Sequence, residues 1–191
     1  KFYLENRVNI KYNDLPKHLV NALVATEDER FYDHSGIDAR GTLRAITSVG
    51  QSGGASTISQ QLAKLLFHGE GDKNLVKRVV QKLKEWIIAT KLERQYTKQE
   101  IIAMYLNRTD FVNNAVGIRS AAQVYLGKRL EDITIDEAAM FVGMLKNPSL
   151  FNPNKRPEKV LERRNVVLNQ MVKNEYLTKE QAETEKKKPL S

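Results

Sequence analysis

The feature that most constrains this chain is a helical apolar arc that contains a carboxylate. Residues 16–31 repeat at roughly 100° per residue, which predicts a helix from Pro16 to Phe31. Glu27 falls near the middle of an arc whose apolar members are Leu19, Val20, Leu23, Val24 and Phe31. Burial of a carboxylate raises its pKa toward the range useful for proton transfer. Glu27 is therefore either a catalytic acid or base, or a buried glutamate paired with an arginine.

Most of the remaining sequence is also patterned as helices, so the predicted fold class is mainly α. Asp14 is expected to cap the first helix. Capping-box spacings predict three later helix starts, at Thr97 with Glu100, Thr134 with Glu137 and Thr178 with Gln181. The other predicted helices span about 39–48, 57–67, 74–95 and 157–174. Residues 51–55 and 68–73 are predicted to be loops, and 7–12 alternates like a short strand.

Composition limits the size and the chemistry of the protein. With 191 residues, 41% of them hydrophobic, the chain is long enough for one domain with a sizeable core or for two small lobes. The net charge of +8 predicts anionic partners: nucleic acid, phosphate-bearing substrates or an acidic membrane surface. The absence of cysteine excludes disulfides and thiolate chemistry. The spacing of His18, His34 and His68 argues against a zinc site, and His34 is expected to order the loop after Phe31.

The helix predicted to follow the Gly53-Gly54 loop has a polar face that suits a phosphorylated sugar. Thr57, Gln60, Gln61 and Lys64 share this face. Amide groups match sugar hydroxyls, whereas a helix N-terminus and a lysine match phosphate. The alternative is an ordinary amphipathic helix with a solvated polar side.

The longest predicted helix, 74–95, combines a cationic seam with an apolar face. The face predicted to be buried in the core consists of Leu75, Val76, Val79, Val80, Leu83, Trp86 and Ile87. The polar seam consists of Arg78, Gln81, Lys82 and Glu85, with Lys77 and Lys84 on its flank. The cations of this seam could bind a diphosphate, and its one carboxylate could serve as a second acid. The alternative is salt bridging within the helix, since Lys82 and Glu85 are three residues apart.

Several motifs, in this order, resemble the peptidoglycan glycosyltransferase (transglycosylase) family, found in class A penicillin-binding proteins and monofunctional transglycosylases. They are Glu-Asp-x-x-Phe-x-x-His-x-Gly at 27–36, Gly-Ala-Ser-Thr-Ile-Ser-Gln-Gln at 54–61, Lys-x-Lys-Glu at 82–85, Lys-x-x-Ile-Ile-x-x-Tyr-Leu-Asn at 98–107 and Asp-Glu-Ala-Ala at 136–139. The resemblance covers about 15–153, up to the segment that contains Pro148 and Pro153. Most of the chain is thus included.

The resemblance implies a lysozyme-like, two-lobed helical fold with a central cleft, and lipid II as the substrate. Glu27 would be the general base that removes the proton from the 4-hydroxyl of the acceptor sugar. That oxygen would attack C1 of the donor sugar with inversion and release of the polyprenyl diphosphate. Glu85 would be the second acid, which positions the acceptor or coordinates a divalent cation, Mg²⁺ or Mn²⁺. No organic cofactor is implied.

The resemblance also implies a set of substrate contacts. These residues are Asp28, Phe31, His34, Ser56, Thr57, Gln60, Gln61, Lys64, Lys77, Arg78, Lys82 and Asn107. Among them, Lys64, Lys77 and Lys82 would neutralise the leaving group. The sequence departs from the family pattern at Gln81, where an arginine is usual, and Arg78 is expected to compensate. Residues 110–113 replace a usual aromatic and glycine stretch.

A lipid-linked substrate requires contact with a membrane. The expected location is the extracytoplasmic face of the bacterial cytoplasmic membrane, through an N-terminal anchor in a longer protein from which this single domain, 1–191, was excised. Leu66 and Phe67 are expected to touch lipid. Expected partners are lipid II, the nascent glycan strand, a fused transpeptidase domain and other cell-wall synthesis proteins. Inhibition by the phosphoglycolipid moenomycin is also implied.

Two other functions compete with this interpretation. A lysozyme-like muramidase or lytic transglycosylase would also use a glutamate in a helical cleft, but as a general acid with less need for cations. A basic module without catalytic activity could bind nucleic acid or anionic lipid. Aromatic residues make up only 7% of the chain and no DNA- or RNA-reading motif is present, so nucleic acid is not an expected partner.

Overall fold

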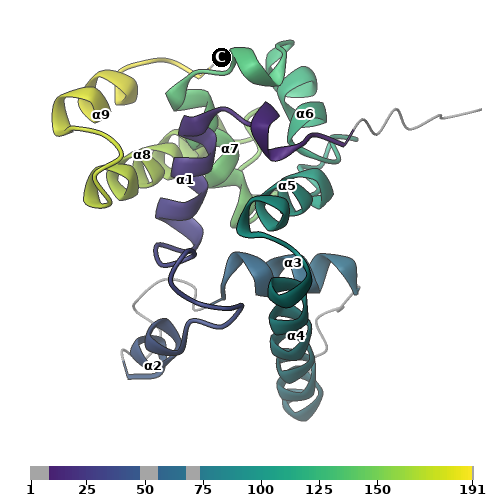
Figure 1. Cartoon of the computed structure of the whole chain (residues 1–191). Coiled ribbons are helices and arrows are strands. Elements are labelled where there is room, and N and C mark those ends of the chain that lie inside the picture. Colours follow the sequence, from purple (N-terminus) through teal and green to yellow (C-terminus); the bar gives the residue numbers. More distant parts are fainter. Residues whose placement is uncertain (1–8, 48–55, 68–73, 191) are drawn as a thin grey trace, which may run out of the picture.

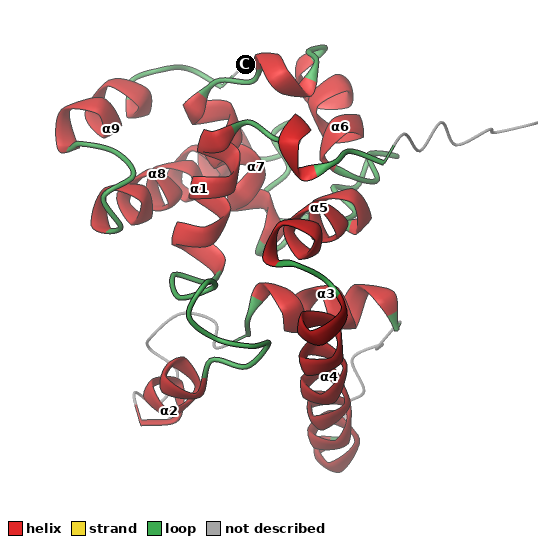
Figure 2. Cartoon of the chain, in the orientation of Figure 1, coloured by secondary structure: helices red, strands yellow, loops and turns green. Residues whose placement is uncertain are grey.

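The computed structural model describes residues 9–47, 56–67 and 74–190. In chain order (Figure 1), the elements are the 3₁₀ turn η1 (Tyr12–Asp14), α1 (Lys17–Glu27), α2 (Ala39–Thr47), α3 (Ile58–Leu66), α4 (Leu75–Gln95), α5 (Lys98–Arg108), α6 (Ile118–Ala121), the π-helical turn η2 (Ala122–Leu126), the 3₁₀ turn η3 (Leu130–Asp132), α7 (Ile135–Leu145), α8 (Pro157–Lys173) and α9 (Lys179–Lys186). Figure 2 shows helices and loops without a strand among the described residues. The predicted mainly α class is confirmed.

The main body is built around α7, whose side chains are almost all buried and which packs against α1 and α8. Small residues let these helices approach closely. Gly143 of α7 faces Arg163 of α8, and a Cβ added at Gly143 would lie 3.0 Å from the Arg163 Cγ. Ala138 and Ala139 are fully buried in the same helix. The small residues of the 136–139 motif therefore serve the packing of the core.

A second part of the fold projects from this body. Helix α3 packs against both α4 and α5, and α4 extends away from the body as a long arm (Figure 1). Helix α2 lies on the same side of the body as α4. The body and this projecting part form the two lobes that the resemblance implied.

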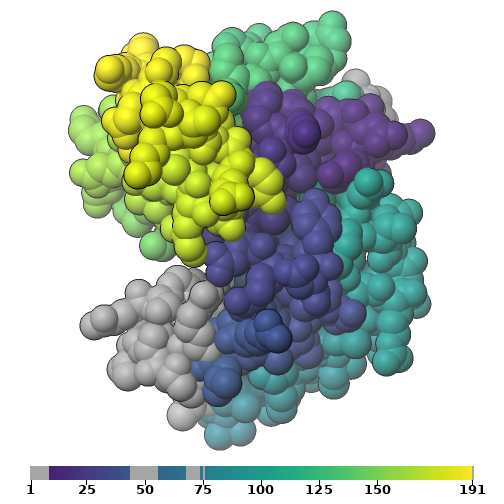
Figure 3. All heavy atoms as spheres, turned by 60° about the vertical axis from the view of Figure 1, so that its left-hand side comes forward, coloured from purple at the N-terminus to yellow at the C-terminus, as the bar shows by residue number. Residues whose placement is uncertain are grey.

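The two ends of the described chain meet on one face of the body. Figure 3 shows the yellow C-terminal helices beside the purple and blue N-terminal segment. Lys173 at the end of α8 forms an ion pair of 2.7 Å with Glu29. The buried Arg164 donates to the carbonyls of Lys186 and Lys188, at 3.0 and 2.8 Å, and so fixes the segment after α9.

Helix boundaries follow the local capping chemistry. Thr97 accepts from the Glu100 N–H, and the Glu100 carboxylate accepts from the Thr97 N–H at 2.7 Å, which is the predicted capping box. Thr178 and Gln181 form the same reciprocal pair. The Thr134 N–H donates to Glu137 at 2.8 Å. The predicted starts of α5, α7 and α9 are confirmed.

The N-terminal predictions were partly wrong. Helix α1 ends at Glu27, not at Phe31, because the chain turns after Asp28 to pack the Phe31 ring into the core. Asp14 does not cap α1; its carboxylate instead accepts from the Lys11 N–H at 2.9 Å and closes η1. The part of the predicted strand that is described, 9–12, is not a strand: residues 9–11 are irregular, and Tyr12 begins η1. Its first two residues and the predicted loops 51–55 and 68–73 lie outside the described residues.

The predicted core face of α4 was also wrong. Val76, Val79, Val80, Leu83 and Ile87 are between 45% and 70% exposed, and Trp86 is half-buried. Periodicity showed correctly that one face of this helix is apolar. It could not show that α4 projects from the body, so that much of this face lies at the surface (Figure 1).

Candidate active site

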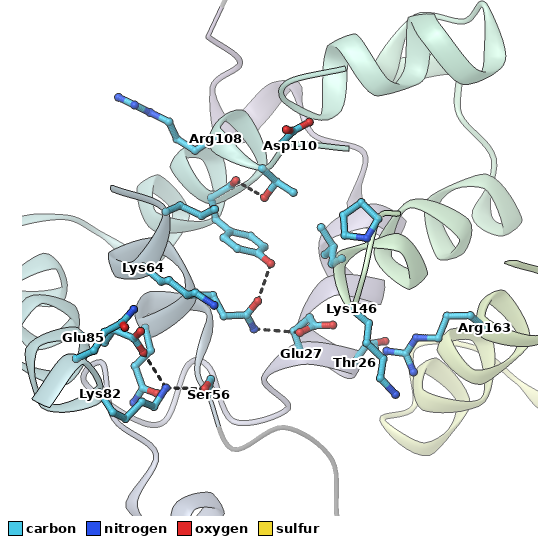
Figure 4. A pocket seen from close by; sticks show the side chains of 18 of the residues that line it. Thr26, Glu27, Ser56, Lys64, Lys82, Glu85, Arg108, Asp110, Lys146 and Arg163 are labelled. Atoms are coloured by element: carbon cyan, nitrogen blue, oxygen red, sulfur yellow. Dashed lines mark hydrogen bonds and ion pairs between the residues drawn. The ribbon is translucent and has the colours of Figure 1, made fainter. Parts of the chain in front are cut away.

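A cleft of about 1550 Å³ lies where the projecting lobe joins the body. Its walls come from the end of α1, from α3 and α4, from the end of α5 and the residues after it, and from α7 and α8 (Figure 4). Pockets for small ligands usually measure roughly 300–1,000 Å³. This cleft is large enough for a substrate of several sugar units.

Glu27 is the last residue of α1, and its carboxylate points into the cleft. Burial raises the pKa of Glu27 above its ordinary value, and the neighbouring Asp28 adds to this effect. A hydrogen bond from Gln61 Nε2 to Glu27 Oε2, 3.0 Å long, lowers the pKa, as do the charges of Arg163 and Lys146. The predicted desolvated carboxylate is present, and it has an amide donor and two nearby cations.

The wall formed by α3 and α4 carries the second acid. Lys82 Nζ donates to Glu85 Oε2 at 3.0 Å and to Ser56 Oγ at 2.7 Å. Glu85 is only 12% exposed, and Lys64 and Arg78 line the same wall. The intrahelical salt bridge considered from the sequence therefore exists, and it faces the cleft. Figure 4 shows Lys64, Lys82 and Glu85 on one side of Glu27, and Lys146 and Arg163 on the other.

Three motif residues next to Glu27 lie behind the cleft instead of lining it. Asp28 Oδ2 accepts from the Ile58 N–H, at the first residue of α3, at 3.0 Å. His34 Nε2 lies 3.0 Å from Asp28 Oδ1, and His34 Nδ1 accepts from the Gly36 N–H at 3.2 Å. Phe31 is fully buried. These contacts join α1 to α3, and they confirm that His34 orders the loop.

Lys98 stabilises the same loop from the start of α5. Its Nζ donates to the His34 carbonyl at 2.6 Å and to Glu93 at 2.8 Å, and it lies 4.3 Å from the centre of the Phe31 ring. Gly36 has a φ of +93°, and a Cβ there would lie 2.8 Å from the backbone of Ala89 in α4. The glycine of the 27–36 motif is therefore required by backbone conformation and by close packing.

The two polar residues at the start of α3 make structural contacts. Thr57 caps the helix by accepting from the Gln60 N–H at 3.1 Å, and its hydroxyl donates to the Gly36 carbonyl at 2.7 Å. Gln60 is fully buried, borders the cleft and donates weakly, at 3.4 Å, to the same carbonyl. Both residues hold the backbone of Gly36 against α3.

Two more predicted substrate contacts do not line the cleft. Asn107 exchanges two hydrogen bonds with the backbone of Ile10, with its Oδ1 3.1 Å from the Ile10 nitrogen and its Nδ2 2.9 Å from the oxygen. Asn107 thus anchors the N-terminal segment to α5. Lys77 is exposed on α4 and is absent from the cleft wall. The structure therefore brings together Glu27, Ser56, Gln60, Gln61, Lys64, Arg78, Lys82 and Glu85.

The side chains of the cleft wall that the sequence interpretation missed include one buried phenol and three cations. They are Tyr105, Arg108, Lys146 and Arg163. Tyr105 lies within the 98–107 motif, and its ring is buried, but its hydroxyl reaches Gln61. Lys146 comes directly after α7, and Arg163 lies within α8. Both come close to Glu27 only because segments that are far apart in the sequence pack together. No local pattern marked them.

The loop that departs from the family pattern is strained. Val112, Asn113 and Asn114 have φ values of 58°, 51° and 62°, in the left-handed region. Asparagine tolerates this region, whereas for a β-branched residue such as valine it is unusual. The loop begins at Asp110, which lines the cleft.

The site residues do not by themselves form a metal centre. No group of three or more histidine and acidic side chains within 9–47, 56–67 and 74–190 is arranged to hold a metal ion. Glu85, the expected metal ligand, is already paired with Lys82.

Comparison with known proteins identifies the family. The family model described as transglycosylase matches residues 1–172. Penicillin-binding protein 1A of Haemophilus influenzae is 39% identical over 190 residues, which are 97% of this chain and 22% of that protein. Penicillin-binding protein 1F of Bacillus subtilis is 40% identical over 186 residues, 95% of this chain and 25% of that protein. This chain therefore belongs to the transglycosylase family.

A solved structure supports the same conclusion. The crystal structure of penicillin-binding protein 1A from Haemophilus influenzae matches with a TM-score of 0.59 and 26% sequence identity, over 97% of this chain and 18% of that one. The implied lysozyme-like fold is confirmed. The chain spans about a quarter of the length of the curated relatives named here.

Proposed function

We propose that this domain joins lipid-linked disaccharides into glycan strands, as a peptidoglycan glycosyltransferase acting on lipid II. The observation that carries the proposal is the partly buried carboxylate of Glu27, with a raised pKa, in a cleft whose two walls both carry cations. A sugar hydroxyl needs a base before it can attack, and a departing diphosphate needs positive charge. The family membership of the chain supports the same reaction.

In the proposed reaction, Glu27 accepts the proton of the acceptor 4-hydroxyl. The hydroxyl oxygen forms a bond to C1 of the donor sugar while the bond from C1 to the diphosphate oxygen breaks. Attack from the face opposite the diphosphate inverts the anomeric centre. Lys64 and Lys82 neutralise the departing diphosphate, and Glu85 positions the acceptor while it holds the Lys82 ammonium group.

The competing lytic reaction is less well supported. A lytic enzyme would use Glu27 as an acid on polymeric glycan, whose leaving group is a sugar hydroxyl and not a diphosphate. The cations at Lys64, Arg78 and Lys82 on one wall and Arg163 on the other suit an anionic leaving group better. Separate incubation with lipid II and with polymeric peptidoglycan distinguishes the two reactions.

The decisive experiment replaces Glu27 with glutamine, which keeps the shape and removes the base. We expect polymer formation from fluorescent lipid II to fall by about 10²–10⁴-fold, the usual contribution of a positioned base. The matched control is Glu29→Gln, because Glu29 lies two residues further along and pairs with Lys173, outside the cleft wall. Substantial residual activity in Glu27→Gln would contradict the assignment of the base.

The pH dependence follows from the environment of Glu27. A general base must be ionised, and burial raises the pKa of Glu27 above its ordinary value of 4.5, so the acidic limb of kcat/KM should lie above that pH. The raised pKa also means that the ionised carboxylate opposes folding at neutral pH. Glu27→Gln should therefore melt no lower than the wild type at pH 7.

We further propose that the domain works at a membrane surface. The structure contains no helix, among its described residues, that is long and apolar enough to cross a bilayer. The exposed valines and leucine of α4 lie on a helix that also carries lysines, and Phe67 at the end of α3 is 63% exposed. Apolar side chains beside cations suit an anionic lipid interface. Leu66 packs partly against the core, so Phe67 is the better candidate of the two for lipid contact.

The proposed location is the extracytoplasmic face of the bacterial cytoplasmic membrane. The relatives are about four times as long as this chain, which supports the expectation of an anchor and of further domains in a longer protein. A transpeptidase domain and other cell-wall synthesis proteins are the proposed partners. The cationic cleft also suits a phosphoglycolipid inhibitor such as moenomycin.

A further inference from the structure

A chain of two hydrogen bonds leads from the core to the carboxylate of Glu27. The Tyr105 hydroxyl lies 2.8 Å from Gln61 Oε1, and Gln61 Nε2 lies 3.0 Å from Glu27 Oε2, as the dashed lines beside Glu27 in Figure 4 show. The three residues come from α5, α3 and α1. Tyr105 is only 3% exposed, so its hydroxyl depends on a partner within the protein.

The direction of these bonds follows from what each group can donate. Burial raises the pKa of Tyr105, and the charge of Glu27 adds to this effect, so the phenol keeps its proton. The amide oxygen of Gln61 can only accept, and its nitrogen can only donate. With the oxygen facing Tyr105, the nitrogen faces Glu27.

The reverse orientation of the amide would have a specific consequence. The Gln61 oxygen would then face Glu27, and two oxygens can share a hydrogen bond only if the carboxylate is protonated. The observed orientation therefore favours the ionised carboxylate, and the reverse orientation favours the neutral acid. The groups that also act on Glu27 are Arg163 and Lys146, which favour its charge, and Asp28, which opposes it.

We propose that Tyr105 is a positioning residue: its hydroxyl holds the Gln61 amide with the nitrogen toward Glu27, and so keeps the base ionised. This inference rests on the proposed function of Glu27 as the base. Tyr105 borders the cleft, and its hydroxyl acts on Glu27 through Gln61. It differs in this respect from a residue that binds a sugar directly.

The test is the pH profile of kcat/KM for Tyr105→Phe with lipid II. Phenylalanine keeps the buried ring and removes the hydroxyl. We expect the acidic limb to move to higher pH, with about fivefold lower kcat/KM on the limb, the usual effect of losing one hydrogen bond, and convergence with the wild type at high pH. The matched control is Tyr125→Phe, because the Tyr125 hydroxyl makes a 2.7 Å hydrogen bond to the Phe111 carbonyl, away from Glu27. This control should leave the limb in place.

A second variant keeps the inference testable if Tyr105→Phe does not fold. Gln61→Met removes the amide and keeps the length of the side chain, and it should move the acidic limb at least as far. In the Gln61→Met background, Tyr105→Phe should cause no further shift, because its effect passes through the amide. An unchanged limb in Gln61→Met would overturn the inference.

An equal loss of activity at every pH in Tyr105→Phe would also overturn it, since a purely structural role produces that result. The Glu27→Gln variant, measured in parallel, distinguishes failure of the base assignment from failure of the positioning role of Tyr105. If Glu27→Gln is active, the proposed base is wrong. If Glu27→Gln is inactive and the limb of Tyr105→Phe stays in place, only the positioning role of Tyr105 fails.

Discussion

The conservative change Asp28→Asn distinguishes a substrate contact from a structural anchor. The resemblance implied that Asp28 binds substrate, whereas the structure places its carboxylate between the loop and α3, with a side chain only 4% exposed. His34 Nδ1 accepts from the Gly36 N–H, so His34 Nε2 carries the proton that is donated to Asp28. The carboxylate thus accepts from two different donors, His34 and the Ile58 N–H.

An asparagine has one accepting atom where the carboxylate has two. If its oxygen faces the Ile58 N–H, its NH₂ group opposes the His34 N–H. If the oxygen instead takes the place of Oδ1, the NH₂ group at the place of Oδ2 lies 3.0 Å from the Ile58 nitrogen and 3.1 Å from His34 Nε2, so the Ile58 N–H is left without an acceptor. A change of the His34 tautomer only moves the conflict to the Gly36 N–H. Leaving one buried donor unpaired beside a lost charge costs about 2–3 kcal/mol, which for a domain of this size lowers Tm by about 4–12 °C.

The assay is thermal and urea denaturation of Asp28→Asn together with steady-state kinetics on lipid II. Glu29→Gln is the control, because its partly exposed pair with Lys173 should contribute no more than about 1 kcal/mol. Below its melting temperature, Asp28→Asn should also lose kcat, since Ile58 begins the helix that carries Gln61. A variant that melts within about 1 °C of the wild type but has a raised KM would refute this reasoning and restore Asp28 as a substrate contact.

Two further predictions test the strained loop and the membrane surface. Val112→Gly should raise the free energy of unfolding by about 0.5–1 kcal/mol in urea denaturation, because removing the strain of a valine in the left-handed region outweighs the entropic cost of glycine. Val112→Ala is the control, and equal stability of the two variants would contradict the prediction. Phe67→Glu combined with Leu83→Glu should lower binding to anionic vesicles by about tenfold or more, since each half-exposed side chain contributes about 1 kcal/mol at an apolar interface. Val124→Glu, which replaces an exposed valine outside the cleft wall, is the control, and unchanged vesicle binding by the double variant would reject the proposed surface.

The sequence predicted the helices well where their ends depend on nearby residues. Thr97, Thr178 and Pro157 mark helix starts through contacts within three or four residues, and such contacts can be recognised without knowledge of the fold. The end of α1 was missed because it is set by a distant contact. The turn after Glu27 places the Phe31 ring against the ammonium group of Lys98 in α5, and Lys98 lies more than sixty positions further along the chain.

The same distinction explains which site residues were predictable. A carboxylate in an apolar arc identified Glu27, and a polar seam on each of two helices identified Gln61, Lys64, Lys82 and Glu85. Tyr105 was not recognised, because the pattern of α5 shows that the ring is buried but not what its hydroxyl reaches. The exposure of the apolar face of α4 was missed for a related reason. Periodicity shows which face of a helix is apolar, but it does not show whether another element packs against that face.

The motifs of this family contain two kinds of residue, and the structure separates them. Some face the cleft, and others, such as Asp28 and Asn107, hold the elements that carry the first kind. Glu27 ends one helix and Gln61 lies in another, so their 3.0 Å contact depends on how α1 and α3 are joined. Asp28, the residue directly after the base, makes that joint by accepting from the first N–H of α3. The adjacency of Glu27 and Asp28 in the sequence is thus explained by one requirement: the base and the anchor that places its amide partner must move as a unit.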